Sequence, residues 1–391
     1  MRSKVVATAM LLSLIAAAGA AGAAQPEFRS IQIHHWVDGG LSPEQIDQTV
    51  AWAKKANVNV LQFQVRRVGD AYYDSAYEPR ATNIKGGADF DPLGYILKKG
   101  RENGMQVHAW VNTYRTWTGK NPPTDPKHVV LRHPEWLTKD VDGVVAGGEG
   151  TFLDPGAPGV REYLVGIVAD ILKKYDVDGI MLDYIRYPGR KYGYSDAAVA
   201  AFNKRYGRTG KPLEADYLWC QWRRDQVTET VKAIQKEING TKPWVVLSAA
   251  TIPWGACPDD FLKTDAYAHV FQDWRLWMEK GLIDINMPMN YKDPANEKHV
   301  PMYLGWLDGM KRWSYGRTAV NTIMLFKGNV DGAVTQVRQT RDKGLGVAGF
   351  AFSQGSSANA LADKLAASVW KEPAPVPKLP WKPDRPSEAP K

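Results

Sequence analysis

The segment Asp178-Gly-Ile-Met-Leu-Asp-Tyr-Ile-Arg-Tyr-Pro188 joins an apolar run to a cluster of polar and aromatic side chains. Residues 178–183 form a short, almost continuously apolar stretch, which predicts a strand buried on both faces. The amphipathic stretch before it, residues 159–175, has the spacing of a helix that covers such a strand. The run ends in Asp183, a carboxylate beside two tyrosines and Arg186. The segment therefore predicts one unit of a parallel sheet with a polar end.

The same alternation of apolar runs and amphipathic stretches continues along most of the chain. Strands are predicted at residues 30–36, 58–65, 106–111, 178–183, 244–249, 283–288, 318–325 and 346–352. Helices are predicted at residues 43–55, 92–103, 159–175, 196–206, 216–238, 266–280, 296–313, 331–343 and 359–370. Eight such strand–helix units predict an α/β fold, a closed (β/α)8 TIM barrel. An open doubly wound sheet is the alternative, but it usually has fewer strands and a phosphate loop after the first.

Two predicted connections are much longer than the roughly two to six residues that usually join strands and helices. They are residues 66–91, after the second strand, and residues 112–158, after the third. Long loops in a compact fold are usually functional, and in a barrel these two lie over the C-terminal mouth, where active sites sit. The barrel is expected to span residues 25–370. The proline-rich tail, residues 371–391, is expected to be extended and linker-like.

The N-terminus has the layout of a secretory signal peptide. Arg2 and Lys4 precede an apolar run at residues 5–18, and small residues follow up to Ala24. The run is shorter than the ~20 apolar residues that cross a bilayer, so a membrane anchor is disfavoured. We expect residues 1–24 to be removed and the mature protein to be periplasmic or secreted. Two cysteines, Cys220 and Cys257, could form one disulfide in that compartment, and the sequence leaves their pairing open.

Composition excludes several classes of protein. The 391 residues are 44% hydrophobic and 24% charged, as in an ordinary soluble globular protein. The formal charge is +8; the leader and the tail from Lys371 contribute two positive charges each, which leaves +4 for the body. That charge, without a dense Lys/Arg stripe, argues against a nucleic-acid partner but suits a polyanionic cell-wall surface. A monomer is expected.

No motif in the chain indicates a cofactor or a metal. Residues 344–349 match the glycine pattern of dinucleotide-binding loops, but they lead into a strand, whereas that motif follows a strand and opens a helix. His34 and His35 are adjacent in a predicted strand and therefore face opposite sides. We expect the chemistry to be carried by side chains alone.

Polar residues gather where the predicted strands end. Because the inside of a barrel is filled with bulky apolar layers, charged groups confined to strand ends should face the mouth. Asp183 is the clearest case: a carboxylate beside apolar strand residues has a pKa that its site can tune. An ion pair with Arg186 is the structural alternative. Polar side chains also follow the second, third and sixth strands, and they include Gln64, Arg66, Asn112, Arg115, Asn290 and Tyr291.

Tryptophan is abundant, with 15 in the chain. Trp110, Trp117, Trp254, Trp274 and Trp277 fall at or after predicted strand ends. Aromatic faces offer flat apolar area beside hydrogen-bonding groups, the combination that sugar rings require. For any one tryptophan, a place in the core is the alternative.

A series of motifs stands in order along residues 29–366. They are Gln64-Val-Arg66, Gly69-Asp-Ala71, Tyr77-Glu-Pro79, Val107-His-Ala-Trp-Val-Asn-Thr-Tyr-Arg115, Leu153-Asp-Pro-Gly156, Val160-Arg-Glu-Tyr163, the 178–188 segment, Trp222-Arg-Arg-Asp225, Gln272-Asp-Trp274 and Pro288-Met-Asn-Tyr291. This series resembles the family-10 glycosyl-hydrolase-like proteins. The family includes bacterial envelope enzymes that cut peptidoglycan glycan strands stripped of stem peptides. The resemblance implies a TIM-barrel glycosidase that acts on such a glycan.

Glycoside hydrolysis by this route needs two carboxyl groups, one that donates a proton and one that acts as nucleophile or base. Asp183 is the first candidate. The fifth strand ends Ser248-Ala-Ala-Thr251 without an acid, so the partner must come from a loop, and Asp273, Asp70 and Glu78 remain open. Because the fifth strand lacks an acid, the alternative hypothesis is a barrel that binds cell-wall glycan without cutting it. Expected sugar-positioning residues are Gln64, Arg66, His108, Trp110, Asn112, Arg115, Asp154, Tyr184, Arg186, Tyr187, Trp274, Asn290 and Tyr291, with Asp154 shaping the third loop through its Asp-Pro turn.

Overall fold

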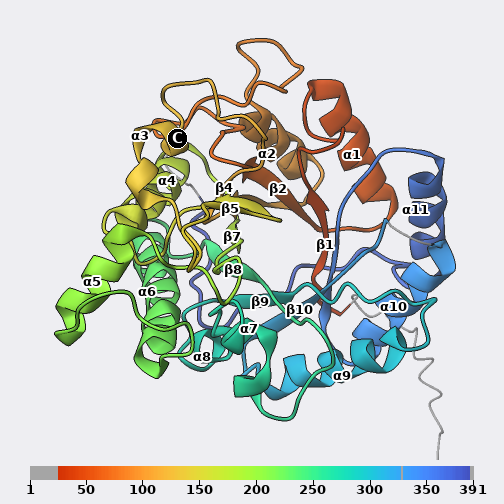
Figure 1. Ribbon diagram of the computed structural model, residues 1–391. Coiled ribbons are helices and arrows are strands. Elements are labelled where there is room, and N and C mark those ends of the chain that lie inside the picture. The colour runs from red at the N-terminus through yellow and green to blue at the C-terminus, as the bar shows by residue number, and fades with distance from the viewer. Residues whose placement is uncertain (1–24, 327–328, 388–391) are drawn as a thin grey trace, which may run out of the picture.

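Eight parallel strands close into a barrel in the computed structural model, which describes residues 25–326 and 329–387 (Figure 1). Around the barrel the order is β1, β2, β3, β7, β8, β9, β10 and β11, and β11 pairs with β1. The predicted TIM barrel is therefore confirmed. The strand bounds are β1 (Arg29–Ile33), β2 (Val60–Arg66), β3 (Gln106–Asn112), β7 (Gly179–Asp183), β8 (Val246–Thr251), β9 (Ile285–Pro288), β10 (Thr318–Ile323) and β11 (Gly346–Gly349).

Side chains alternate between the inside of the barrel and the surrounding helix layer, as the pleat of a strand requires. On β7, Ile180 and Leu182 belong to the core that the helices cover, whereas Met181 belongs to a separate core inside the barrel. The inner core also contains Trp110 and Met287. Asp183 continues the inward-facing series, one step above Met181 at the end of the strand. The strand pairing sets Asp183 beside Asn112 of β3.

Helices form the outer ring (Figure 1). The helices α1 and α2 begin at a side-chain cap followed by proline; Ser42 caps α1 and Asp91 caps α2. The main helices are α1 (Pro43–Lys55), α2 (Pro92–Glu102), α4 (Val160–Lys174), α5 (Asp196–Tyr206), α6 (Tyr217–Thr241), α9 (His299–Arg312), α10 (Val330–Asp342) and α11 (Ser356–Ser368).

The helix predicted at residues 266–280 is wrong as one element. It is split into α7 (Asp265–Ala268) and α8 (Trp274–Glu279). Between them, Phe271 has a φ of 57°, a conformation that ends a right-handed helix. The break turns Gln272 into the core, where it accepts a hydrogen bond from the Ile252 amide and donates to the carbonyls of Ile185 and Ala250. Tertiary hydrogen bonds to the end of β8 and to the segments that follow β7 and β8 therefore override the local helical pattern.

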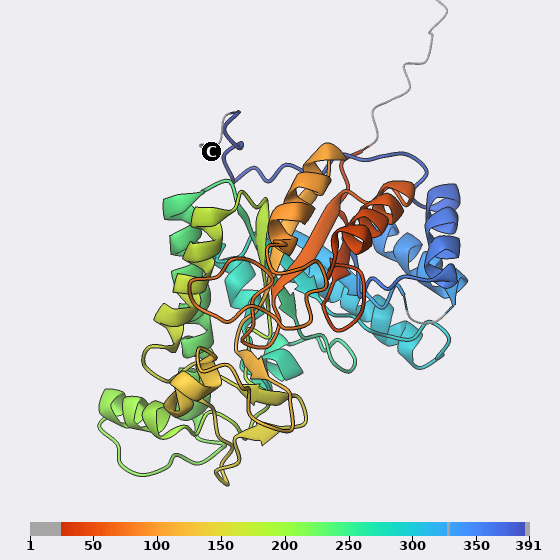
Figure 2. The same cartoon turned by 90° about the horizontal axis from the view of Figure 1, so that it is seen from above.

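The long loop after β3 carries a small sheet that the sequence pattern did not predict. Its strands are β4 (Arg115–Trp117), β5 (Ala146–Gly147) and β6 (Gly150–Phe152), in the antiparallel order β4-β6-β5. The loop also contains the short helices α3 (Val129–Arg132) and η1 (Pro134–Trp136). A third short helix, η2 (Phe261–Lys263), precedes α7. Figure 2 shows the small sheet beyond one end of the barrel and the C-terminal segment at the other.

The described part of the proline-rich tail, residues 371–387, is extended, and it is docked across the N-terminal end of the barrel. Val376 and Leu379 pack against the inner core. Farther along, the Trp381 indole donates to Asp284 at 2.8 Å, and Arg385 pairs with Asp178 at 2.6 Å. These contacts close the end of the barrel opposite Asp183.

The predicted signal peptide, residues 1–24, lies outside the residues that the structure describes. Within the described part, no helix combines the length and apolar character that a bilayer crossing requires. Cys220 and Cys257 are both free thiols.

Candidate active site

Asp183 is the last residue of β7, and its side chain lies at the C-terminal mouth of the barrel. The residue is only 6% exposed. The Trp110 indole N–H donates to its Oδ2 at 3.2 Å, and the Tyr184 amide donates to its Oδ1 at 2.7 Å. Burial raises the pKa of Asp183. The two hydrogen bonds lower it, and so does the positive charge of the nearby Arg186, but together they offset the rise only in part.

A cavity of about 410 Å³ opens directly above Asp183. That volume is in the range of small-ligand sites. Its walls combine aromatic faces with a few charged groups, the chemistry that the sequence led us to expect for a sugar. The lining residues are Gln32, Trp110, Glu149, Met181, Asp183, Tyr184, Arg186, Ala250, Ile252, Trp254, Met289, Tyr291, Lys292 and Phe350.

Glu149 supplies a second carboxylate to this cavity, and the sequence reasoning missed it. It lies with Gly148 in the two-residue turn that joins β5 to β6, where Gly147 pairs with Gly150. Gly150 has a φ of 102°, and a Cβ there would lie 2.2 Å from the Trp117 carbonyl oxygen, so this position requires glycine. The signal that could have found the turn is Gly147-Gly-Glu-Gly150 itself, an acidic residue among glycines of the kind that form tight hairpins.

Arg186 holds Glu149 in a two-pronged ion pair. Its Nη1 donates to Glu149 Oε2 and its Nη2 to Oε1, both at 2.9 Å. The same guanidinium lies over the rings of Tyr184 and Trp254, at 5.2 and 5.6 Å from their centroids. The Arg186 side chain is buried, whereas the Glu149 side chain is 40% exposed. The ion pair of Arg186 is thus with Glu149, while Asp183 takes its hydrogen bonds from Trp110 and a backbone amide.

Arg115 ties the hairpin to the barrel from the other side. Its Nε donates to the Glu149 carbonyl at 2.8 Å, and its Nη1 donates to the Tyr184 hydroxyl at 2.7 Å. Its guanidinium also lies 5.6 Å from the ring of Trp36, a tryptophan that is 46% exposed. Tyr184 has a φ of 49°, so the backbone turns sharply just after Asp183. The two arginines therefore anchor both the side chain and the backbone of Glu149.

Two of the acids that the sequence offered as partners of Asp183 are engaged elsewhere. The Glu78 side chain is fully buried. Its two carboxylate oxygens share the single N–H of Arg66 Nε, at 2.8 and 2.9 Å, and Oε1 also accepts from the Tyr163 hydroxyl at 2.8 Å. Asp70 accepts from Arg67 at 2.7 Å and from the Val68 amide at 2.9 Å. Neither residue lines the cavity. Both hold the loop after β2 in shape.

The third candidate, Asp273, caps α8 by accepting from the Leu276 amide at 3.1 Å. Burial raises its pKa, as it does for Asp183, but Asp273 does not line the cavity. Its neighbour Trp274 is fully buried in the helix layer. Asp154 is also buried and accepts from the amides of Gly156 and Ser195, a position that shapes the third loop.

The remaining predicted positions divide into three groups. Trp110, Tyr184, Arg186 and Tyr291 line the cavity with Asp183. Gln64 and Asn112 lie beside it, joined by a hydrogen bond of 3.4 Å, and Arg115 supports the hairpin. The others lie away from the cavity: Arg66, His108, Tyr187, Asn290 and Trp274.

Strand geometry explains the residues that lie away from the cavity. His108 is four residues before the end of β3, so at about 3.3 Å per residue it lies about 13 Å down the strand. There the centroid of its ring lies 5.9 Å from that of Phe28, and the residue lines the space that the tail covers. Asn290 precedes Tyr291 and points the other way, donating to the Tyr303 carbonyl at 3.2 Å. His108 therefore lies too far down its strand to reach the cavity, and the Asn290 side chain points to the opposite side from that of Tyr291.

Comparisons with known proteins agree with the barrel fold. The glycosyl hydrolase-like 10 family profile matches residues 28–314, well over half of the chain. The chain belongs to the glycosyl hydrolase-like 10 family. The predicted family is thereby confirmed, and the barrel is a glycosyl-hydrolase-family domain. Glu149, Asp183 and Lys292 all fall within the matched residues.

Two curated relatives carry the name glycosyl hydrolase. Glycosyl hydrolase YngK of Bacillus subtilis is 29% identical over 252 residues, which are 61% of this chain and 47% of that protein. Glycosyl hydrolase DigH of Escherichia coli K12 is 28% identical over 261 residues, which are 61% of this chain and 55% of that protein. The matches thus span about half the length of these relatives.

Among solved structures, the glycoside hydrolase domain of PgaB from Bordetella bronchiseptica superimposes with a TM-score of 0.63 at 13% identity, covering 90% of this chain and 100% of that domain. The catalytic domain of β-amylase from Paenibacillus polymyxa has a TM-score of 0.62 at 14% identity, covering 89% and 99%. At these identities the likeness concerns the fold, the barrel.

Proposed function

We propose that this protein is a glycoside hydrolase that cleaves a polysaccharide of the bacterial envelope. The observation that carries the proposal is the pair of carboxylates, Asp183 and Glu149, on the wall of one cavity with aromatic faces around them. Glycosidases need such a pair flanking the scissile bond. Family membership supports the same reaction class.

The surroundings of the two carboxylates assign them different roles. Asp183 is buried and its pKa is raised, so it keeps its proton to a higher pH than a free aspartic acid does. It is the general acid, which donates its proton to the oxygen of the leaving sugar. Glu149 is more exposed and stands in an ion pair with Arg186. It is the carboxylate that acts on the other side of the bond, as nucleophile or as base for water.

Aromatic side chains of the cavity provide the surface on which a sugar ring stacks. Trp254 is 38% exposed and stands at the rim, whereas Tyr291 and Phe350 lie deeper. The ring centroids of Tyr291 and Phe350 are 5.2 Å apart. Flat apolar faces bind the C–H side of a pyranose ring and leave its hydroxyl groups to polar partners. Trp110 serves in addition as the hydrogen-bond donor that orients Asp183.

For the substrate we propose peptidoglycan glycan strands that have lost their stem peptides, in the periplasm or outside the cell. The motif resemblance supports this substrate. The signal-peptide pattern of residues 1–24 supports export, and the net positive charge of the body suits an anionic wall.

Product analysis tests the proposal. Purified protein is incubated with peptide-free glycan strands, and soluble products are identified by mass spectrometry. We expect fragments with new reducing ends from the wild type and none from Asp183→Asn. Retention of the wild-type protein on insoluble glycan without any products would overturn the enzyme assignment and would favour the glycan-binding barrel.

A further inference from the structure

Lys292 is a cation of the cavity that neither the predicted motifs nor the proposed chemistry uses. It follows Tyr291 on the segment after β9, and both residues line the cavity. Its backbone is fixed at both polar atoms: the amide donates to the Asn290 carbonyl at 2.8 Å, and the carbonyl accepts from Gln336 of α10 at 2.7 Å. Its place beside the cavity is therefore built into the fold.

The ammonium group of Lys292 has few partners. Nζ donates one hydrogen bond, to the Pro253 carbonyl at 3.1 Å, although an ammonium has three N–H donors. Within residues 25–326 and 329–387, no carboxylate lies within ion-pair distance of it, whereas the Arg186 charge is matched by Glu149. Burial lowers the pKa of Lys292, and no neighbouring carboxylate offsets that effect. A half-buried cation in this state gains most from an anionic ligand.

We propose that Lys292 binds a carboxylate carried by the sugar in this cavity. The inference rests on the proposed function and names the feature of the glycan that the site recognises. A uronic acid presents such a group, and so does an amino sugar with a lactyl ether. In peptidoglycan the lactyl carboxylate is free only when the stem peptide is absent, because the peptide converts it into a neutral amide.

This ion pair accounts for selection of peptide-free strands by charge. An ammonium forms a charge-assisted hydrogen bond with a carboxylate, whereas an amide at the same place offers no negative charge and carries a bulky chain. Loss of a hydrogen bond to a charged group costs about 10- to 100-fold in binding or in kcat/KM. Lys292 would thus be a specificity residue, separate from the two carboxylates that cut the bond.

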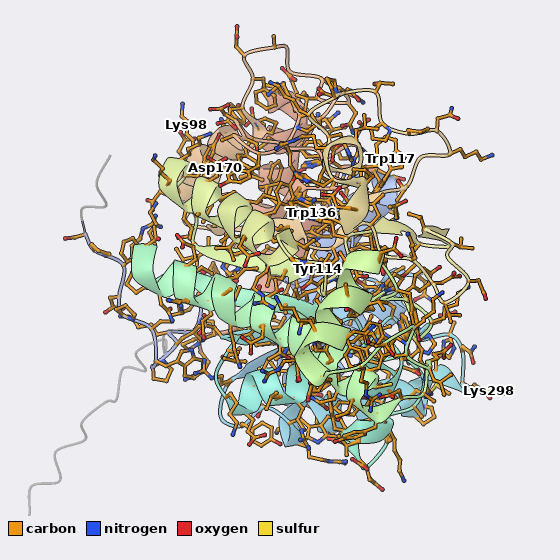
Figure 3. All side chains as sticks on the ribbon, turned by 60° about the vertical axis from the view of Figure 1, so that its left-hand side comes forward. Lys98, Tyr114, Trp117, Trp136, Asp170 and Lys298 are labelled. Carbon is orange, nitrogen blue, oxygen red and sulfur yellow. The ribbon has the colours of Figure 1, made fainter. Side chains whose placement is uncertain are left out.

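The test combines two substrates with two variants. The substrates are peptide-free glycan strands and the same strands with the lactyl carboxyl reduced to an alcohol. The variants are Lys292→Met, which keeps an unbranched side chain one atom shorter and removes its charge, and Lys298→Met as the matched control. Lys298 belongs to the same loop, is exposed and lies at the periphery of the molecule (Figure 3).

On native strands, Lys292→Met should lose about 10- to 100-fold in kcat/KM, mainly through KM, and Lys292→Arg should recover part of it. On reduced strands the wild type and Lys292→Met should be equal, and Lys298→Met should match the wild type throughout. An equal loss on both substrates would overturn the proposal, because Lys292 would then act on something other than the carboxylate.

Affinity measurements keep this result separate from the proposed hydrolysis. Calorimetry with both strands, and with hyaluronan oligosaccharides as a uronate probe, records binding without turnover. Carboxylate-dependent affinity in the wild type that disappears in Lys292→Met supports the proposal even if no bond is cut. If Lys292→Met weakens the affinity for hyaluronan more than the affinity for peptide-free strands, the carboxylate that Lys292 binds is that of a uronic acid. Affinity that ignores the carboxylate would contradict the role of Lys292 while leaving hydrolysis standing.

Discussion

The two nitrogens of the Arg186 guanidinium each donate to one oxygen of Glu149, at 2.9 Å, so the hairpin tip above the barrel is tied to the strand end that carries Asp183. Through this contact, a residue of the long loop after β3 is brought to the carboxylate of β7. The pairing also sets the plane of the Glu149 carboxylate, because a two-pronged hydrogen bond allows little rotation.

Replacement of Arg186 by lysine tests this relationship. A lysine keeps the charge but cannot hold both carboxylate oxygens, so Arg186→Lys should lower kcat by about 10- to 100-fold. Arg190→Lys is the control, because Arg190 is exposed and its ion pair with Glu214 on the surface is long, with 3.6 Å between nitrogen and oxygen. The measurement is the turnover of peptide-free glycan. Equal kcat values for Arg186→Lys and the control would show that the orientation of Glu149 is unimportant.

The raised pKa of Asp183 predicts a pH dependence of stability. An unfolded aspartic acid releases its proton near pH 4, whereas folded Asp183 keeps its proton above that pH. In this window the folded protein binds more protons than the unfolded chain, so its free energy of unfolding falls as the pH rises. Asp183→Asn lacks this titration. The Tm of the wild type minus that of Asp183→Asn should therefore decrease as the pH is raised from about 4. A difference that increases with pH would mean that Asp183 is stabilised as the anion.

Glu78 is expected to matter for folding and not for chemistry. Glu78→Gln leaves the buried Arg66 without a counter-charge, which should lower the free energy of unfolding by about 3–5 kcal/mol. Glu214→Gln, in an exposed pair, should change it by less than about 1 kcal/mol. Denaturant unfolding gives both values, and activity per folded molecule should persist in Glu78→Gln. A stable but inactive Glu78→Gln would return Glu78 to the list of catalytic acids.

The docked tail should stabilise the barrel. Trp381→Ala removes the hydrogen bond to Asp284 and the contact of the ring with Arg317 at 4.5 Å, and should cost about 2 kcal/mol of unfolding free energy. Lys378→Ala is the matched control, because its pair with Asp384 is exposed and should be worth less than about 1 kcal/mol. If the two variants unfolded alike, the tail would contribute nothing at Trp381.

The barrel could be predicted from the sequence because its strands appear as apolar runs and its helices as amphipathic stretches, and both patterns are local. The same runs placed Asp183 at a strand end, where it lies. Glu149 was missed because the short pattern at residues 147–150 indicates only a tight turn. The position of that turn beside Asp183 depends on a loop of more than forty residues that folds into its own sheet. The break at Gln272 and the ion pair of Arg385 with Asp178 likewise depend on contacts between distant segments. Residues such as His108 were assigned from the right strand, but at the wrong end of it.

Turnover of single-acid variants tests the central claim, that Asp183 and Glu149 are the catalytic pair, most directly. Initial rates on peptide-free glycan are compared for Asp183→Asn, Glu149→Gln, Asp273→Asn and Asp70→Asn, after each is shown to be folded. We expect the first two each to lower kcat by about 10³-fold, with the double variant little worse than either, because groups that act as a unit fail together. The other two should stay close to the wild type. Near-wild-type turnover of Glu149→Gln, or a loss in Asp273→Asn equal to that in Asp183→Asn, would contradict the assignment.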